Sequence, residues 1–296
     1  MVSNRFSDYQ SPDIASKIET WGECADYTWD NRWKPQKSSS TIAIRRRRIS
    51  DSIGESFPLR KMGALHFWRE LQKDIQETDN VDNATVNRAI SCATCAVRFT
   101  YEEQLHLVKC PSVKRLPENG PRQEYFTQAQ VMKMHEICLD LDRGDLADIL
   151  LFSAYTGIRQ GYVLNYLMKQ DFDLERNLVR VGYDKDRPTK TGQPRDIFIH
   201  PKILPIVERR INNLYTFKDD WTNRHQLDRN FKKVRRFAML PDTHVWHCLR
   251  HSLATWLGAV AKPNQVKDIM GHSSWKQTEQ YCKYVEKASE NAILAL

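Results

Sequence analysis

The sequence predicts a mostly α-helical fold with a small β-sheet, arranged in two domains. Most segments are typical of helices, with N-terminal caps and, between Val86 and Val97, apolar residues at the spacing of one helix face. Only two short segments, LVRV at 178–181 and DIFI at 196–199, resemble strands. The 296 residues are also many for a single hydrophobic core, and Pro117, Gly120 and Pro121 interrupt the helical pattern.

The interruption separates the two expected domains. The first is predicted to cover residues 1–117, and residues 118–123 are predicted to form a linker. The second is predicted to cover residues 124–296, including a C-terminal tail. It begins with a capping box in which Thr127 is followed three residues later by Gln130, a pattern typical of a helix N-terminus.

Four helices are expected in the first domain, at 14–33, 41–53, 62–76 and from a cap at Asn83 onward. In the fourth helix, one face carries apolar residues at helical spacing, namely Val86, Ile90, Ala93 and Val97. The opposite face carries Thr85, Arg88, Cys92 and Cys95. The first domain is therefore predicted to be entirely helical.

The second domain is expected to combine helices with a β-hairpin. A buried helix at 145–155 ends at Thr156-Gly157, and the two strand segments flank the turn RPTKTGQPR, which places Lys190 near a hairpin tip. The remaining helices are expected at 202–214, 227–238, 248–260, 265–270 and from Ser274 through Tyr281. Gly271 is expected to close the helix before it.

The charge balance permits a polyanionic partner. Lys and Arg number 45 against 37 Asp and Glu, for a formal net charge of +8. Residues 1–120 hold 18 basic and 16 acidic side chains (+2), and residues 121–296 hold 27 and 21 (+6). No stretch approaches the ~20 apolar residues of a membrane span, and the N-terminus lacks a signal-peptide pattern. Seven scattered cysteines fit a reducing compartment, so we expect a cytoplasmic protein.

Four separate segments carry the polar residues that phosphodiester transfer needs without a metal. Guanidinium groups neutralise non-bridging phosphate oxygens, a tyrosine hydroxyl can form a covalent phosphodiester, and a lysine can protonate the leaving oxygen. These residues are Arg159, Lys190, His247, Arg250, His272 and Tyr281. The set predicts chemistry that requires no cofactor and no metal.

The order and approximate spacing of these six residues resemble the tyrosine recombinase (phage integrase) family. The resemblance covers essentially all of residues 124–285, and the first ~115 residues resemble that family's helical core-binding domain less specifically. It implies a site-specific DNA recombinase or integrase with a core-binding domain and a catalytic domain. Such an enzyme cleaves and rejoins strands through a 3′-phosphotyrosine, without ATP.

The resemblance also implies a role for each matching residue. Arg159 and Arg250 would hold the scissile phosphate, and His272 would hydrogen-bond that phosphate or orient its neighbours. Lys190 would protonate the departing 5′-oxygen, and His247 would assist proton transfer at the nucleophile. The nucleophile would be Tyr281, which lies nine residues after His272.

Three neighbouring positions leave questions open. Tyr284 lies one helical turn after Tyr281 and is the rival nucleophile, although the offset from His272 favours Tyr281. Tyr162 stands where the family usually has Glu or Asp, and we expect activity despite this departure. For His251, a structural role and a supporting role in the site both stay open.

Further DNA contacts are expected from basic and polar surfaces, although some of these residues could simply be solvated. The candidates are Arg45, Arg46, Arg47, Arg48, Thr85, Arg88, Lys232, Lys233, Arg235 and Arg236. The implied partner is double-stranded DNA carrying recombination sites, bound by a homotetramer. The C-terminal tail is expected either to dock on a neighbouring protomer or to fray. A host DNA-bending protein or a directionality factor stays open, and we expect no N-terminal arm-binding domain.

Three alternatives compete with the recombinase. A type IB topoisomerase would use the same residues and reseal its own strand, and a catalytically weak DNA-binding protein would keep only the basic surface. A zinc-dependent nuclease needs a ligand cluster that the sequence does not offer. A structural zinc site at Cys92 and Cys95 would need four ligands at matched spacing, for which the nearest other candidates are His106 and Cys110. The implied setting is the cytoplasm of a bacterial host, at the nucleoid.

Overall fold

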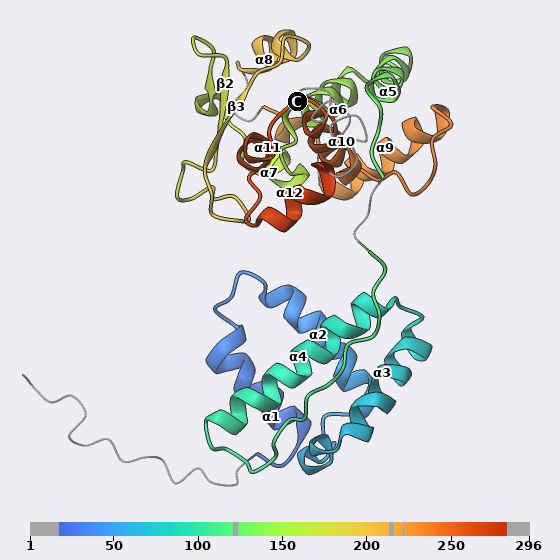
Figure 1. Ribbon diagram of the computed structural model, residues 1–296, viewed down its shortest axis with the longest axis vertical. Helices are drawn as coiled ribbons and strands as arrows, with labels where there is room; N and C mark the ends of the chain where they lie inside the picture. The colour runs from blue at the N-terminus through green and yellow to red at the C-terminus, as the bar shows by residue number, and fades with distance from the viewer. Residues whose placement is uncertain (1–17, 121–123, 213–215, 222, 283–296) are drawn as a thin grey trace, which may run out of the picture. The chain divides into compact units, whose positions relative to one another are not determined.

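The computed structural model describes residues 18–120, 124–212, 216–221 and 223–282. The chain divides into two compact units, residues 1–121 and 122–296 (Figure 1). The division falls at Pro121, inside the segment that the sequence predicts as a linker. Each unit has a hydrophobic core of its own.

The first unit is helical throughout its described part. Its elements are α1 (Trp21–Thr28) with a π-helical extension (Trp29–Trp33), α2 (Ser39–Ile53), a 3₁₀ turn (Leu59–Gly63), α3 (Leu65–Asp79) and α4 (Asn83–Glu102). The first helix begins at a capping box formed by Thr20 and Glu23, later than predicted. The predicted residues 14–17 lie outside the described part.

Helix α4 is the central helix of this unit because α1, α2 and α3 all pack against it. Its predicted apolar stripe is buried. Cys92, which we expected on an opposite, polar face, is buried as well, since α2 covers that side of the helix. The N-cap is Asp82 and not Asn83, because the Asp82 carboxylate accepts a hydrogen bond from the Thr85 amide at 2.8 Å.

The second unit combines helices with one three-stranded antiparallel sheet. The helices are α5 (Gln128–Asp140), α6 (Gly144–Thr156), α7 (Gln160–Asn165), α8 (Leu204–Arg210), α9 (Arg224–Phe237), α10 (His247–Gly258), α11 (Pro263–Met270) and α12 (Trp275–Cys282). The strands, in spatial order, are β1 (Phe172–Asp173), β2 (Leu178–Val181) and β3 (Arg195–Phe198). The predicted hairpin is confirmed, with β3 beginning one residue earlier than expected and Val179 opposite Ile197.

Helix α6 lies at the centre of the second unit. It is apolar on all sides, which is typical of a helix that is covered all round, and it packs against both α5 and α10. Its buried acid, Asp148, is neutralised by Arg209 at 2.5 Å and Arg210 at 2.6 Å. The helix ends at Gly157 in the left-handed conformation, with φ of 60°. This end directs the chain towards Arg159 and α7.

Candidate active site

Arg250 connects three of the segments that carry the predicted catalytic residues. It lies on α10 and is 6% exposed. Its Nη1 donates a hydrogen bond to the Gly157 carbonyl at 2.5 Å, and its Nη2 donates to the Met270 carbonyl. These carbonyls end α6 and α11, where the helix dipoles concentrate partial negative charge. Arg250 therefore fixes the two turns that lead to Arg159 and His272.

A glycine stands at each of these two turns. Gly157 and Gly271 have φ values of 60° and 61°, in the region that only glycine adopts readily. A Cβ added to Gly271 would lie 2.8 Å from Nη1 of Arg195, so the turn also needs the absence of a side chain. Arg195 begins strand β3 and is 7% exposed.

The site concentrates positive charge in a buried setting. Burial, followed by the charges of Arg159 and Arg195, lowers the pKa of Arg250 to about 9. Burial, followed by the charge of Arg159, lowers the pKa of Arg195 to about 10. Burial also lowers the pKa of Arg159. All three groups stay protonated near pH 7, so the site favours an anion.

The Tyr281 hydroxyl lies among histidines. Tyr281 is 9% exposed, and its hydroxyl is hydrogen-bonded to Nδ1 of His251. His251 lies one helical turn after His247 on α10, with ring centroids 4.8 Å apart and nearly perpendicular rings. The His272 ring also stacks on the Tyr281 ring, with centroids 5.8 Å apart, and its Nδ1 contacts Thr278 Oγ1 at 2.9 Å.

Two of these histidines are neutral at pH 7. Burial, followed by the effects of His251, Arg250 and Arg159, lowers the pKa of His247 to about 4. Burial also lowers the pKa of His272 to about 4, with further contributions from Arg250 and Arg159. A neutral imidazole can accept a proton, as a group assisting a tyrosine nucleophile must.

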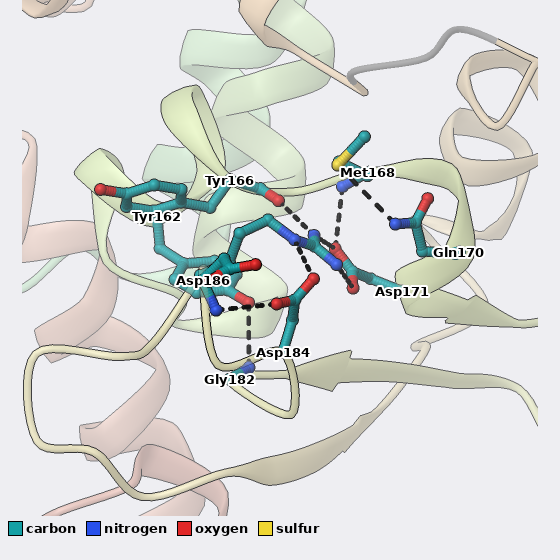
Figure 2. Close-up of polar contacts among 9 residues, drawn as sticks. Tyr162, Tyr166, Met168, Gln170, Asp171, Gly182, Asp184 and Asp186 are labelled. Carbon is teal, nitrogen blue, oxygen red and sulfur yellow. Dashed lines mark hydrogen bonds and ion pairs between the residues drawn. The ribbon is translucent and has the colours of Figure 1, made fainter.

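The hairpin that carries Lys190 is anchored at its base, as Figure 2 shows. The Tyr162 hydroxyl accepts a hydrogen bond from the Gly182 amide at 2.9 Å, directly after β2. Arg187 binds the Asp171 carboxylate through two bonds of 2.6 and 3.0 Å, and it also contacts Asp184 at 2.9 Å. Bidentate arginine–carboxylate pairs fix geometry well.

Lys190 itself lies beyond these anchors and is exposed. It makes no hydrogen bond or ion pair with the rest of the described chain. Tyr162, by contrast, is buried, and its hydroxyl holds the hairpin. The structure thus brings Arg159, Arg250, His272 and Tyr281 together around α10, whereas the Lys190 side chain extends from the hairpin without such a contact.

The residues of the first unit that were expected to contact DNA differ in exposure and in whether an acidic side chain already pairs with them. Arg46 is paired with Asp26 at 2.7 Å, Arg48 with Asp79, and Arg47 with the exposed Asp51 at 3.6 Å. Arg45 and Thr85 are half-buried, and Arg88 is exposed. The run Arg45–Arg48 is therefore largely engaged within its own unit.

On α9, the basic stretch divides between two faces. Lys232, Lys233 and Arg236 are exposed, as a contact with phosphates requires. Arg235 is 2% exposed, and its guanidinium binds the Asp242 carboxylate and the carbonyls of Asp242 and His244. The expectation that Arg235 reaches DNA is therefore corrected. It shares the buried face of α9 with Val234 and holds the loop before α10.

The sequence interpretation left His251 open and missed Arg195. Both could have been found from periodicity. His251 is four residues after His247 on one helix, so the two side chains share a face. Arg195 and Ile197 alternate with exposed residues along β3, and the inward position of an arginine is unusual for a strand.

Two features are absent from the described residues. No group of three or more His, Cys, Asp or Glu side chains in that part of the chain could hold a metal ion. Among the helices described, none is long and apolar enough to span a bilayer. Tyr284 and the C-terminal tail lie outside the described residues.

The chain is similar to known DNA-processing proteins. The family model described as "Phage integrase family" matches residues 124–287. No curated protein matches the chain. The integrase of transposon Tn1549, solved with transposon right-end DNA, is 16% identical with a TM-score of 0.75, over 94% of this chain and 100% of that one. A lambda integrase tetramer bound to a Holliday junction is 16% identical with a TM-score of 0.73, over 90% and 79%.

The buried neutral histidines predict a pH-dependent stability. The folded pKa of His272, about 4, lies below the ordinary value of 6.5. Between these values the unfolded chain binds more protons than the folded chain, so the contribution of His272 to stability is complete above pH 6.5 and is lost towards pH 4. Replacing His272→Gln should lower the slope of unfolding free energy against pH in this window by up to about 1.4 kcal/mol per pH unit.

Urea unfolding at several pH values measures this slope. The matched control is His225→Gln, because His225 is exposed on α9, and its slope should equal that of the unsubstituted protein. An unchanged slope in His272→Gln would contradict a neutral, buried His272.

Proposed function

Since the chain belongs to the phage integrase family, we propose that it is a site-specific DNA recombinase that cleaves and rejoins strands through a 3′-phosphotyrosine. The observation that carries this proposal is the position of the Tyr281 hydroxyl. The hydroxyl is hydrogen-bonded to His251, and the Tyr281 ring stacks on His272. Both histidines lie on segments that the hydrogen bonds of Arg250 hold together. A nucleophile, a proton acceptor and phosphate-binding cations thus occupy one site.

The cleavage step follows from these groups. Arg159 and Arg250 bind the non-bridging oxygens of the scissile phosphate and stabilise the charge of the transition state. The Tyr281 oxygen attacks phosphorus and passes its proton to Nδ1 of His251, whose ring packs against that of His247. The bond from phosphorus to the 5′-oxygen breaks, and Lys190 supplies the proton to that oxygen.

Rejoining reverses the same steps. A 5′-hydroxyl of a partner strand attacks the phosphotyrosine, its proton passes to Lys190, and Tyr281 recovers its proton from the histidine. The energy of the phosphodiester is kept in the protein adduct, so the reaction needs no ATP. The side chains of the site supply both the charge stabilisation and the proton transfers that this scheme requires.

The substrate and assembly follow from the family and from related structures. Those structures hold transposon-end DNA or a Holliday junction, and one is a tetramer. We extend to this chain double-stranded DNA as the partner and a homotetramer as the active assembly. The exposed Lys232, Lys233 and Arg236 on α9 would bind backbone phosphates. Reaction on the bacterial nucleoid, in the cytoplasm, fits this role.

Covalent trapping tests the proposed reaction. On nicked duplexes with a randomised central segment, the short fragment after the cleavage point diffuses away, so a 3′-phosphotyrosine adduct accumulates. In excess EDTA we expect adducts that share a DNA sequence. Tyr281→Phe should abolish them because phenylalanine lacks the nucleophilic oxygen, and Tyr284→Phe, the matched control, should retain them.

Other outcomes would redirect or reject the proposal. Adducts without a shared sequence would indicate a topoisomerase. Adducts that survive Tyr281→Phe would show that another residue is the nucleophile. Salt-sensitive binding to a defined sequence without any adduct would indicate a DNA-binding protein that has lost cleavage.

The role of Lys190 as general acid gives a second prediction. Lys190→Ala should slow cleavage of an ordinary duplex by roughly 10² to 10⁴-fold, the usual contribution of a positioned acid. A duplex with sulfur at the 5′-bridging position should restore the rate, because a thiolate leaves without protonation. Lys185→Ala, an exposed lysine earlier in the same hairpin, is the control. Equal defects on both duplexes would assign Lys190 to another role.

A further inference from the structure

The proposed cleavage and rejoining steps leave the buried Arg195 without a role. Strand β3 alternates buried and exposed residues, so Arg195 and Ile197 face inward while Asp196 and Phe198 face outward. Arginine is among the residues least often buried without a partner. Its inward position on a strand next to Arg159 and Arg250 therefore needs an explanation.

Two nitrogens of the Arg195 guanidinium lack a hydrogen-bond partner. Nε and Nη1 are both buried, and neither is bonded to any group in the described part of the chain. The acid beside it in sequence, Asp196, faces outward and pairs with Arg180 at 4.0 Å. A buried positive charge with unpaired donors is strongly unfavourable. The fold keeps this charge although nothing described within it neutralises it.

The side chain that faces Arg195 from α7 is a tyrosine and not a carboxylate. Tyr162 is close enough to interact electrostatically with Arg195. Burial, the largest effect, raises the pKa of Tyr162, so the hydroxyl is neutral. Its oxygen already accepts the Gly182 amide at 2.9 Å. Tyr162 therefore supplies no negative charge to Arg195.

The guanidinium of Arg195 lies at the edge of the site. The Gly271 backbone approaches it so closely that a Cβ there would come within 2.8 Å of Nη1 and 3.1 Å of Cδ. Gly271 directly precedes His272, which stacks on Tyr281. A hollow opens beside the guanidinium, and its lining includes Arg195, Gly271 and His272 as well as the charged Asp196, Lys267 and Asp268. Arg195 therefore borders both this hollow and the turn that delivers His272 to the site.

We propose that Arg195 is a third guanidinium that binds the scissile phosphodiester, alongside Arg159 and Arg250. This inference rests on the proposed recombinase function and adds a substrate-binding residue to it. Both terminal nitrogens of Arg250 already donate hydrogen bonds to the carbonyls of Gly157 and Met270, so fewer of its N–H groups are left for the phosphate. Nε and Nη1 of Arg195 are unpaired but buried, so the guanidinium turns towards the bound phosphate, whose oxygens then satisfy these donors. The anion neutralises the charge that the fold leaves unpaired.

The first experiment measures anion binding without DNA. The melting temperature of the full chain is recorded with increasing inorganic phosphate, for the unsubstituted protein and for Arg195→Met. Because methionine removes the unpaired charge, the variant should melt at an equal or higher temperature in phosphate-free buffer. Its melting temperature should then rise less with phosphate. A lower melting temperature with an unchanged response to phosphate would show that Arg195 is structural.

The second experiment identifies which phosphate Arg195 contacts. Adduct formation is compared on duplexes with an ordinary scissile phosphate and with a methylphosphonate there, which lacks the negative charge. Arg195→Met should be about 100-fold slower on the ordinary duplex, as for loss of one transition-state donor. On the methylphosphonate duplex, the rate of adduct formation by Arg195→Met should come within a few fold of the rate of the unsubstituted protein. This substrate lacks one negative charge, so its transition state needs one positive charge fewer. Arg176→Met, an exposed arginine between β1 and β2, should behave as the unsubstituted protein on both.

The outcomes separate this inference from the proposed function. Equal defects on both duplexes, or recovery only when the methylphosphonate is at a neighbouring position, would overturn the contact between Arg195 and the scissile phosphate. If the unsubstituted protein forms no Tyr281 adduct on any duplex, the proposed function fails. The phosphate titration would still report whether Arg195 holds an anion in that case.

Discussion

The hydrogen bonds from Arg250 to the carbonyls of Gly157 and Met270 are the constraint on which the site depends. They bind the ends of α6 and α11 to the first turn of α10, so α6 meets two helices that lie about 90 residues or more later in the sequence at one guanidinium. Arg159 follows one of these ends and His272 follows the other. Because α6 and α11 each end at a glycine with positive φ, the chain turns sharply after both helices and places Arg159 and His272 in the site.

The same arrangement leaves the site with more positive charge than the described residues neutralise. Arg159, Arg195 and Arg250 have lowered pKa values because they are buried near one another. Their charges and the loss of water also keep His247 and His272 neutral. The fold therefore sacrifices stability for a site that is preorganised for a phosphate and holds neutral bases beside Tyr281.

Much of the fold and the candidate site could be predicted because the signals are local. The Thr127 capping box, the strands around Lys190 and the glycine closing α11 each depend on a few adjacent residues. The rest depends on packing between distant segments. Arg235 is buried because its face of α9 packs on the core and its guanidinium donates hydrogen bonds to the loop at Asp242. The basic residues beside it in the sequence indicate neither contact. Cys92 is buried because α2 covers it. The contact between His251 and Tyr281 depends on where α12 packs on α10.

The central claim is that Arg250 assembles a cationic site that already fits a phosphate. A crystal structure of the full chain with bound orthovanadate, an analogue of the phosphoryl-transfer transition state, tests it most directly. The account predicts that the guanidinium groups of Arg159, Arg195 and Arg250 all contact the ion within hydrogen-bond distance, while Arg250 keeps its bonds to Gly157 and Met270. Vanadate bound elsewhere, or an Arg250 that leaves those carbonyls to reach the ion, would contradict it.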